Sequence, residues 1–481
     1  MTAAAKALAC GALAIAWCAT VAAQARGDGW MGRQGEWRNT SQQSSTGSPS
    51  GNSSAPSTDT SQTTSRDGST SRTRIRVQDP AARELNNLLA AAQESLAKQD
   101  WAAAADDYEK YIEKQPNDAS AHFDLGYAYT ALQRPADAKT EYERAIELDP
   151  KMSAAYLNLG LTLLASNPAA AVEPLQKAAE MLPKDARPEF SLGYALERTG
   201  KMTEAIAAYR AAEKIDGQDY DTRFALARAL LAADQPAEAE SEFRAAIELR
   251  QEEPEAHLGL ARALRAQKKL DPAVDEFTAY LEGEPKDTAV RVERATALEA
   301  LGKNDQALAD LDAAATAGPE SVHALELRAK VDFEEKKFDK AVPALEKASA
   351  LDPRDPNLPA LLGHAYLETR DYANAVKALS VAYHINPKAT DVLGDLVAAE
   401  FSLKNYAATL GALEALEKQL TLPAQGWFVR GACYDKLGQL QPALDAYRKF
   451  LAMNKDENND MYFEASARAR TLERELAEKK R

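Results

Sequence analysis

The chain has 481 residues, of which 45% are hydrophobic and 27% are charged, with a formal net charge of -15 and a pI near 5.1. Proteins that bind nucleic acid usually carry the opposite charge on one face, so this balance argues against a nucleic-acid partner. Helix-forming residues dominate and runs of alternating hydrophobicity are nearly absent. The composition therefore indicates an all-α protein with a large core and no sheet domain.

The N-terminal segment predicts export. Lys6 precedes an apolar stretch from Ala7 to Ala23, and Ala23-Gln24-Ala25 has the small-x-small pattern of a signal-peptide cleavage site. This stretch is short against the roughly 20 residues that cross a bilayer, so we expect residues 1–25 to be removed as a signal peptide, with permanent anchoring as the alternative. The mature protein is predicted to be periplasmic or secreted, with envelope association left open and no transmembrane segment.

Residues 26–78 have a different composition. Ser and Thr occupy more than half of the positions from Thr40 to Thr73, and large apolar side chains are almost absent. Such a segment cannot bury enough surface to offset the entropy of ordering, so we predict a disordered linker. After removal of residues 1–25 the only cysteine is Cys433. We therefore expect no intramolecular disulfide, and we interpret Cys433 as a buried core thiol.

From residue 79 onward the chain is periodic. A small residue such as Gly126, a central alanine twelve residues later, and a bulky side chain four residues after that recur along the chain. Proline follows twelve residues after the alanine in seven of the repeats. This spacing puts the alanine and the bulky residue on one helix face and indicates stacked helical units that share a core. The central alanines recur every 34 residues, with one step of 33 and one position taken by Thr409: Ala104, Ala138, Ala171, Ala205, Ala239, Ala273, Ala307, Ala341, Ala375 and Ala443.

These residues resemble the tetratricopeptide repeat family, whose unit is a pair of antiparallel helices. The resemblance implies an all-α, right-handed superhelical solenoid of about eleven helix-turn-helix units within residues 79–457. Residues 458–481 are expected to form a capping helix with Phe463, Ala467 and Leu472 on its apolar face. The best match is 119–152, with Leu125, Gly126, Tyr129, Ala138, Tyr142, Ala145 and Pro150 in the family's positions. The expected units are 85–118, 119–152, 153–185, 186–219, 220–253, 254–287, 288–321, 322–355, 356–389, 390–423 and 424–457.

The tenth of these units is the weakest match. Val397 replaces its glycine and Thr409 replaces its alanine, so looser helix packing is expected there.

The resemblance also implies a binding surface. In the family, the second, fifth, ninth, twelfth and thirteenth positions of each unit face a concave groove that holds a peptide or helix of a partner protein. In this sequence they combine an aromatic patch with a run of arginines, which suits a partner with apolar anchors and acidic flanks. The candidate residues, with Asn158 beside the groove positions, are Phe123, Tyr127, Asn158, Leu161, Phe190, Tyr194, Phe224, Arg228, Arg262 and Arg265.

A structural interpretation of the same residues is equally open. The fifth-position side chains would then pack on the neighbouring helix, and the arginines would pair with Asp221, Glu197 and Glu255. The Lys and Asn with which some members of the family clamp a C-terminal carboxylate are replaced by Leu89 and Gln93, so chaperone-tail binding is not expected.

No catalytic motif is found: the chain lacks a Gly-x-Ser-x-Gly elbow, a phosphate-binding loop and a His-Glu-x-x-His helix. The five histidines are scattered, with His122 and His257 at a core-packing position, so neither a metal nor a cofactor is expected. We predict a non-enzymatic protein-protein interaction scaffold. One alternative is a non-catalytic subunit of an envelope assembly for polysaccharide export, pilus or secretion biogenesis. Another is an enzyme with its active site in the groove, although little sequence remains for a catalytic domain.

Overall fold

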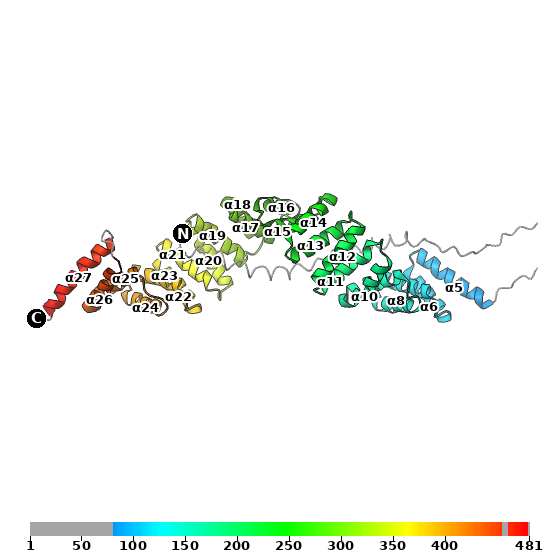
Figure 1. Ribbon diagram of the computed structural model, residues 1–481, viewed down its shortest axis with the longest axis horizontal. Helices are drawn as coiled ribbons and strands as arrows, with labels where there is room; N and C mark the ends of the chain where they lie inside the picture. Colours follow the sequence, from blue (N-terminus) through cyan, green and yellow to red (C-terminus); the bar gives the residue numbers. More distant parts are fainter. Residues whose placement is uncertain (1–79, 455–459, 480–481) are drawn as a thin grey trace, which may run out of the picture. The chain divides into compact units, whose positions relative to one another are not determined.

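The computed structural model describes residues 80–454 and 460–479, and every regular element in these residues is an α-helix (Figure 1). The signal peptide expected at 1–25 and the linker expected at 26–78 lie outside the described residues. The expected all-α solenoid is confirmed, with a first and a second helix in each unit. The pairs are α5 (Pro80–Ala97) with α6 (Trp101–Lys114), α7 (Ala119–Ala131) with α8 (Pro135–Leu148), α9 (Ser153–Leu164) with α10 (Pro168–Met181), α11 (Ala186–Arg198) with α12 (Met202–Ile215), α13 (Tyr220–Ala232) with α14 (Pro236–Leu249), α15 (Pro254–Ala266) with α16 (Leu270–Gly283), α17 (Thr288–Ala300) with α18 (Asn304–Ala317), α19 (Val322–Glu334) with α20 (Phe338–Leu351), α21 (Asn357–Glu368) with α22 (Tyr372–Ile385), α23 (Thr390–Ser402) with α24 (Tyr406–Glu417) and α25 (Ala424–Lys436) with α26 (Leu440–Met453).

Small residues facing bulky ones hold the two helices of a unit together. All ten central alanines are fully buried, and so is Thr409. At Gly126 an added Cβ atom would lie 2.8 Å from the ring of Tyr142, and at Gly431 it would lie 2.8 Å from the ring of Tyr447. Both tyrosine rings are buried, so the absence of a side chain at the glycine lets the helices approach. The interlock inferred from the spacing is present.

The turn between the two helices of a unit is a tight one. In ten of the eleven turns, one residue takes a positive φ, but only Gly200, Gly302 and Gly438 are glycines. The others include Lys268, with a φ of 62°. The unit 153–185 is the exception: α9 and α10 are also joined by three residues, but none of them takes a positive φ, and the residue that this unit lacks is missing from α9, which has 12 residues. Non-glycine residues in this conformation cost of the order of 1 kcal/mol each, which the helix packing on both sides offsets.

Each second helix also contacts the first helix of the next unit, so the core continues from unit to unit. One such cluster combines Leu325 of α19, Leu345 of α20 and Leu358 of α21. In the tenth unit, α23 and α24 make fewer contacts than any other pair of helices within a unit, in agreement with the looser packing expected there.

The last helix, α27 (Asp460–Lys479), packs on α26 as a cap. Its buried residues are Ala465, Ala469 and Leu472, and Arg468 pairs with Asp435 of α25 at 2.6 Å. The expected apolar face was wrong in part: Leu472 is buried, but Phe463 is 74% exposed and Ala467 is exposed. The stripe that packs has the spacing 465, 469, 472, whereas 463 and 467 lie on another side of the helix.

Candidate functional site

The first helices of successive units form one face of the stack. Direct contacts join α7 to α9, α9 to α11, α13 to α15, α17 to α19 and α21 to α23. Among the described helices, no two successive second helices lie as close. The first helices are therefore on the shorter side of the stack, which is where the resemblance places the binding groove. We call this side the first-helix face.

The fifth-position aromatic residues of this face are part of the core. Phe123 lies against Tyr142 and Phe190 against Tyr209, each with ring centroids 5.8 Å apart, and Phe224 meets Phe243 edge-on at 5.9 Å. Each contact joins a first helix to the second helix of the same unit. Phe190 is only 5% exposed. These side chains anchor the two helices of their units to each other; Phe190 has little surface left for a partner, whereas Phe123 and Phe224 stay partly exposed.

The ninth-position residues of units 119–152, 153–185 and 186–219 are partly exposed. Tyr127 and Leu161 are partly exposed on α7 and α9, as is Tyr194 on α11, and the partly exposed Asn158 lies one turn before Leu161. Tyr127 is braced from one side by an edge-on contact with Trp101 at 5.8 Å. Helix α9 contains no charged residue. The first-helix face of units 119–152 to 186–219 therefore presents an apolar and aromatic patch, which we call the aromatic patch: Tyr127, Asn158, Leu161 and Tyr194.

The arginines of this face pair with carboxylates of neighbouring units. Arg228 on α13 donates to Glu197 on α11 at 2.8 Å, and Arg262 and Arg265 on α15 both pair with Glu293 on α17, at 2.6 and 2.9 Å. The expected partner Glu197 is confirmed for Arg228. Glu293 takes the role expected of Glu255, because the next unit brings it beside α15, 31 residues from Arg262.

One carboxyl group near the aromatic patch titrates at an unusual pH. Burial raises the pKa of Asp124 on α7 to about 6, although the hydroxyl of Tyr108, which donates to it at 2.8 Å, opposes the shift. Further along the face, the hydrogen bond with Asp395 raises the pKa of His364, whereas burial and the nearby Arg265 lower the pKa of His323. The charge of Asp124 on this face therefore changes near pH 6.

A His or Arg recurs at the fourth position of several units, a pattern that was not predicted from the sequence. His122 contacts Glu141 at 2.6 Å and the carbonyl oxygen of Pro116 at 3.1 Å, and His257 contacts Glu276 and the carbonyl of Gln251 in the same way. Arg223 also bonds to a carboxylate of its second helix and to the carbonyl six residues before it. The sequence pattern that could have revealed these pairs is a His or Arg followed by a Glu 19 residues later. Each pair ties the loop before a unit to that unit's second helix.

Models of the tetratricopeptide repeat family match the sequence at 119–152, 165–220, 224–288, 292–356, 332–381 and 424–457. The chain belongs to the tetratricopeptide repeat (TPR) family. The helix pairs of the structure have the register of these matches, since α7 and α8 lie within 119–152 and α25 and α26 lie within 424–457.

Several solved structures are similar to this TPR chain. MamA from Desulfovibrio magneticus is 21% identical, over 36% of this chain and 97% of that chain, with a TM-score of 0.34. A tetratricopeptide repeat protein from Parabacteroides merdae is 18% identical, over 54% and 98%, with a TM-score of 0.36. Yeast Tom70 is 15% identical, over 82% and 97%, with a TM-score of 0.32. No curated protein matches the sequence.

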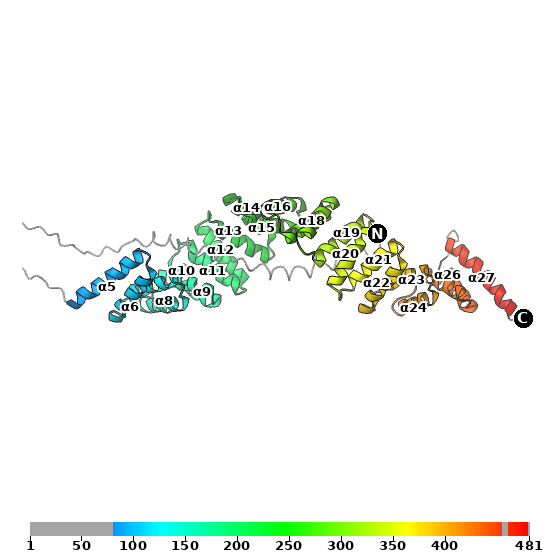
Figure 2. The ribbon, with the colours of Figure 1, turned by 180° about the vertical axis from the view of Figure 1, so that it is seen from behind.

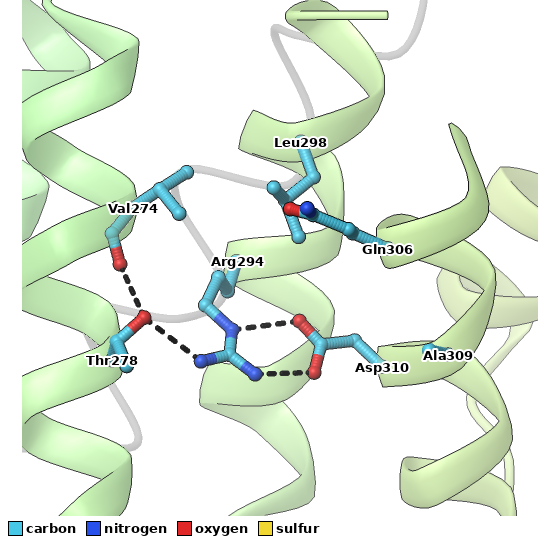
Figure 3. A pocket seen from close by; sticks show the side chains of 7 residues that line it. All are labelled: Val274, Thr278, Arg294, Leu298, Gln306, Ala309 and Asp310. Carbon is cyan, nitrogen blue, oxygen red and sulfur yellow. Dashed lines mark hydrogen bonds and ion pairs between the residues drawn. The ribbon is translucent and has the colours of Figure 1, made fainter. Parts of the chain in front are cut away.

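A pocket of about 270 Å³ lies between three helices of the TPR stack, α16, α17 and α18 (Figure 3). Arg294 stands where seven other units have leucine, and it donates to both oxygens of Asp310, at 2.7 and 2.5 Å, and to the hydroxyl of Thr278 at 2.9 Å. The charged groups in the pocket thus pair with each other. We interpret it as a gap left by an arginine in a leucine position.

Two further observations concern metal binding and cysteine chemistry in the described residues. No group of three His, Cys, Asp or Glu side chains in them is arranged to hold a metal ion. Cys433 is buried beside Thr409, and burial raises the pKa of its thiol to about 11, which makes a nucleophilic role unfavourable. Within 80–454 and 460–479, no helix is both long and apolar enough to cross a bilayer.

Proposed function

We propose that this TPR protein is a non-enzymatic scaffold that binds a peptide or helix of a partner protein on its first-helix face, centred on the aromatic patch. The observation that carries the proposal is the position of Tyr127, Leu161 and Tyr194, which are partly exposed on three first helices that contact one another in series. Large, rigid side chains of this kind supply contact area at a low entropic cost, which is the chemistry of binding hot spots.

The partner segment is proposed to carry apolar anchors for this patch. Helix α9 contributes no charge, and the carboxyl group of Asp124 is the one acidic group on α7. An acidic flank of the partner would meet the exposed Arg198 at the end of α11. Arg228, Arg262 and Arg265 already pair with Glu197 and Glu293. A partner carboxylate would only exchange one ion pair for another, so we assign these arginines a small share of the affinity, below about 1 kcal/mol.

The proposal is tested on a partner captured with the chain from the producing cell and then purified. Tyr127→Ala and Tyr194→Ala should each weaken binding by about tenfold or more, as expected for an interface anchor worth 1.4 kcal/mol or more. Arg228→Ala should change the affinity by less than about fivefold. The matched control is Tyr372→Ala, which removes a partly exposed tyrosine from the start of the second helix α22. Equal effects of Tyr127→Ala and Tyr372→Ala would overturn the assignment of the aromatic patch.

We also propose that the scaffold acts outside the cytoplasm, in the periplasm or as a secreted protein. The support is the apolar stretch from Ala7 to Ala23 followed by Ala23-Gln24-Ala25. Cell fractionation combined with N-terminal sequencing tests this directly. A chain in the periplasmic or secreted fraction that begins near Arg26 is expected, whereas a cytoplasmic chain that still begins at Met1 would contradict export.

A further inference from the structure

The joint between α18 and α19 is the loosest in the stack. Among the helices that the structure describes, these two make fewer contacts than any other consecutive pair. They are joined by residues 318–321, and Gly318, directly after α18, has extended backbone with a φ of -168° and a ψ of -175°. In Figure 2 this joint lies where the colour changes from green to yellow, between the labels α18 and α19. The solenoid therefore has a weak point between its seventh and eighth units.

The sequence at the joint explains the weakness. Seven units have leucine at their seventh position, between 1% and 9% exposed, where it packs on the preceding second helix. The eighth unit has Arg328 there, and its guanidinium group reaches Asp312 on α18 at 2.5 Å. The side chains of this pair are 30% and 60% exposed. The helix α18 also has smaller side chains than the equivalent helix of the preceding unit: Ala314 and Ala315 stand at the positions that the buried Tyr280 and Leu281 occupy in α16.

Of the two other joints with arginine at the seventh position, those of Arg294 and Arg430, the second is also loose. The next-fewest contacts between consecutive helices of the described residues are those of α24 with α25, and α25 also has arginine, Arg430, at its seventh position. There the guanidinium group is covered by the ring of Trp427 at 4.6 Å, and Arg430 is only 8% exposed. Arg328 has no such cover, so its joint depends more on charge.

Ion pairs replace much of the missing apolar contact. Besides Arg328 with Asp312, Lys330 on α19 pairs with Glu299 on α17 at 2.7 Å. Lys347 on α20 pairs with Glu320 in the connecting segment at 2.6 Å. The apolar part of the joint is a small cluster in which Ala324 and Leu327 meet Leu311 and Ala314.

We propose that the α18–α19 joint is an electrostatic hinge, at which the TPR stack bends when its ion pairs are screened or broken. Exposed ion pairs weaken strongly with ionic strength, whereas joints built on buried leucine do not. The helices α5 to α18 and the helices from α19 onward would then move relative to each other, and the first-helix face would change its course between α17 and α19. This property is independent of where a partner binds.

Hydrogen–deuterium exchange of the full-length chain, followed by mass spectrometry, tests the hinge. Raising NaCl from about 0.05 M to about 1 M shortens the Debye length to about 3 Å. Amides of residues 318–328 should then exchange about three- to tenfold faster, which corresponds to the loss of two or three exposed ion pairs. Amides of residues 352–362, at the equivalent joint with Leu362, should keep their rate and serve as the internal control.

Three variants separate charge from packing. Asp312→Asn should speed the exchange at low salt by part of the high-salt change, because it removes one of the three ion pairs of the joint and keeps the size of the side chain. Arg328→Leu should slow the exchange and reduce its salt dependence to the part that comes from the pairs of Lys330 and Lys347. Glu180→Gln breaks the exposed pair with Lys177 within α10 and should leave the joint unchanged. An equal salt response at both joints, or an Asp312→Asn variant with wild-type exchange, would overturn the proposal.

Discussion

Replacing Gly126 by alanine tests the small-against-large interlock on which the fold rests. The new Cβ atom would lie 2.8 Å from Cε1 and 2.9 Å from Cδ1 of Tyr142, and 3.3 Å from the carbonyl oxygen of Ala138. The ring of Tyr142 is fully buried, and its hydroxyl group lies 3.0 Å from that of Thr130, so the ring cannot move away freely. Forcing an extra methyl group into such a site costs about 1–3 kcal/mol. Because alanine has a higher helix propensity than glycine, the substitution also stabilises the helix by about 1 kcal/mol.

The matched control is Gly394→Ala in α23, since an added Cβ atom there meets nothing within 4 Å. This substitution changes only the helix propensity of the residue and should therefore stabilise its helix by about 0.5–1 kcal/mol. The propensity term cancels in the difference between the two variants, which should be about 1–3 kcal/mol. Because long repeat arrays do not always unfold in one step, exchange rates of the α7–α8 and α23–α24 amides are measured beside urea unfolding. A Gly126→Ala variant that is as stable as Gly394→Ala would refute the interlock.

Three further predictions concern pH and turns. Burial alone would lower the pKa of His122, but its contacts with Glu141 and the Pro116 carbonyl raise that pKa above the ordinary value. The free energy by which protonated His122 stabilises the fold is therefore complete at low pH and is lost as the pH rises through the pKa of the folded state. Exchange of the α7–α8 amides should accelerate over that range, and His122→Leu should abolish the pH response. The pKa of Asp124, about 6, is also raised, but ionisation of a buried carboxyl group destabilises the native state, so stability should fall by at most about 3 kcal/mol as the pH rises from about 4 to about 6. In urea unfolding, Asp124→Asn should remove that fall, and an unaltered profile would contradict the assignment. Lys268→Gly should raise thermal stability by up to about 1 kcal/mol because it relieves a positive φ, whereas Gly302→Ala should lower it by a similar amount.

The register of the fold could be predicted from the sequence because a single period controls it. The central alanines, the residues four positions after them and the small residues twelve positions before them identify the packed helix faces without any tertiary information. The same logic failed at the end of the stack. The helix α27 lies outside the 34-residue period, and it buries Ala465 and Ala469 rather than Phe463 and Ala467.

The candidate site could be predicted only as a set of positions. Whether an aromatic residue of the first-helix face packs or is exposed depends on the partner helix, and Phe190 meets Tyr209 whereas Tyr194 remains partly exposed one turn later. Ion pairs between units are harder to predict from the sequence, because Glu293 reaches Arg262 only through the stacking of the next unit. Arg328 is visible in the sequence as a departure from leucine, but its effect on the joint appears only when the neighbouring helix is placed.

The central claim is that a partner binds on the first-helix face at the aromatic patch, and a hydrogen-exchange footprint of the purified complex measures this most directly. Protection on binding should be confined to amides of α7, α9, α11 and α13, with second helices such as α8 and α10 and the C-terminal units unchanged. Protection concentrated on second helices, or on α19 to α27, would contradict the account.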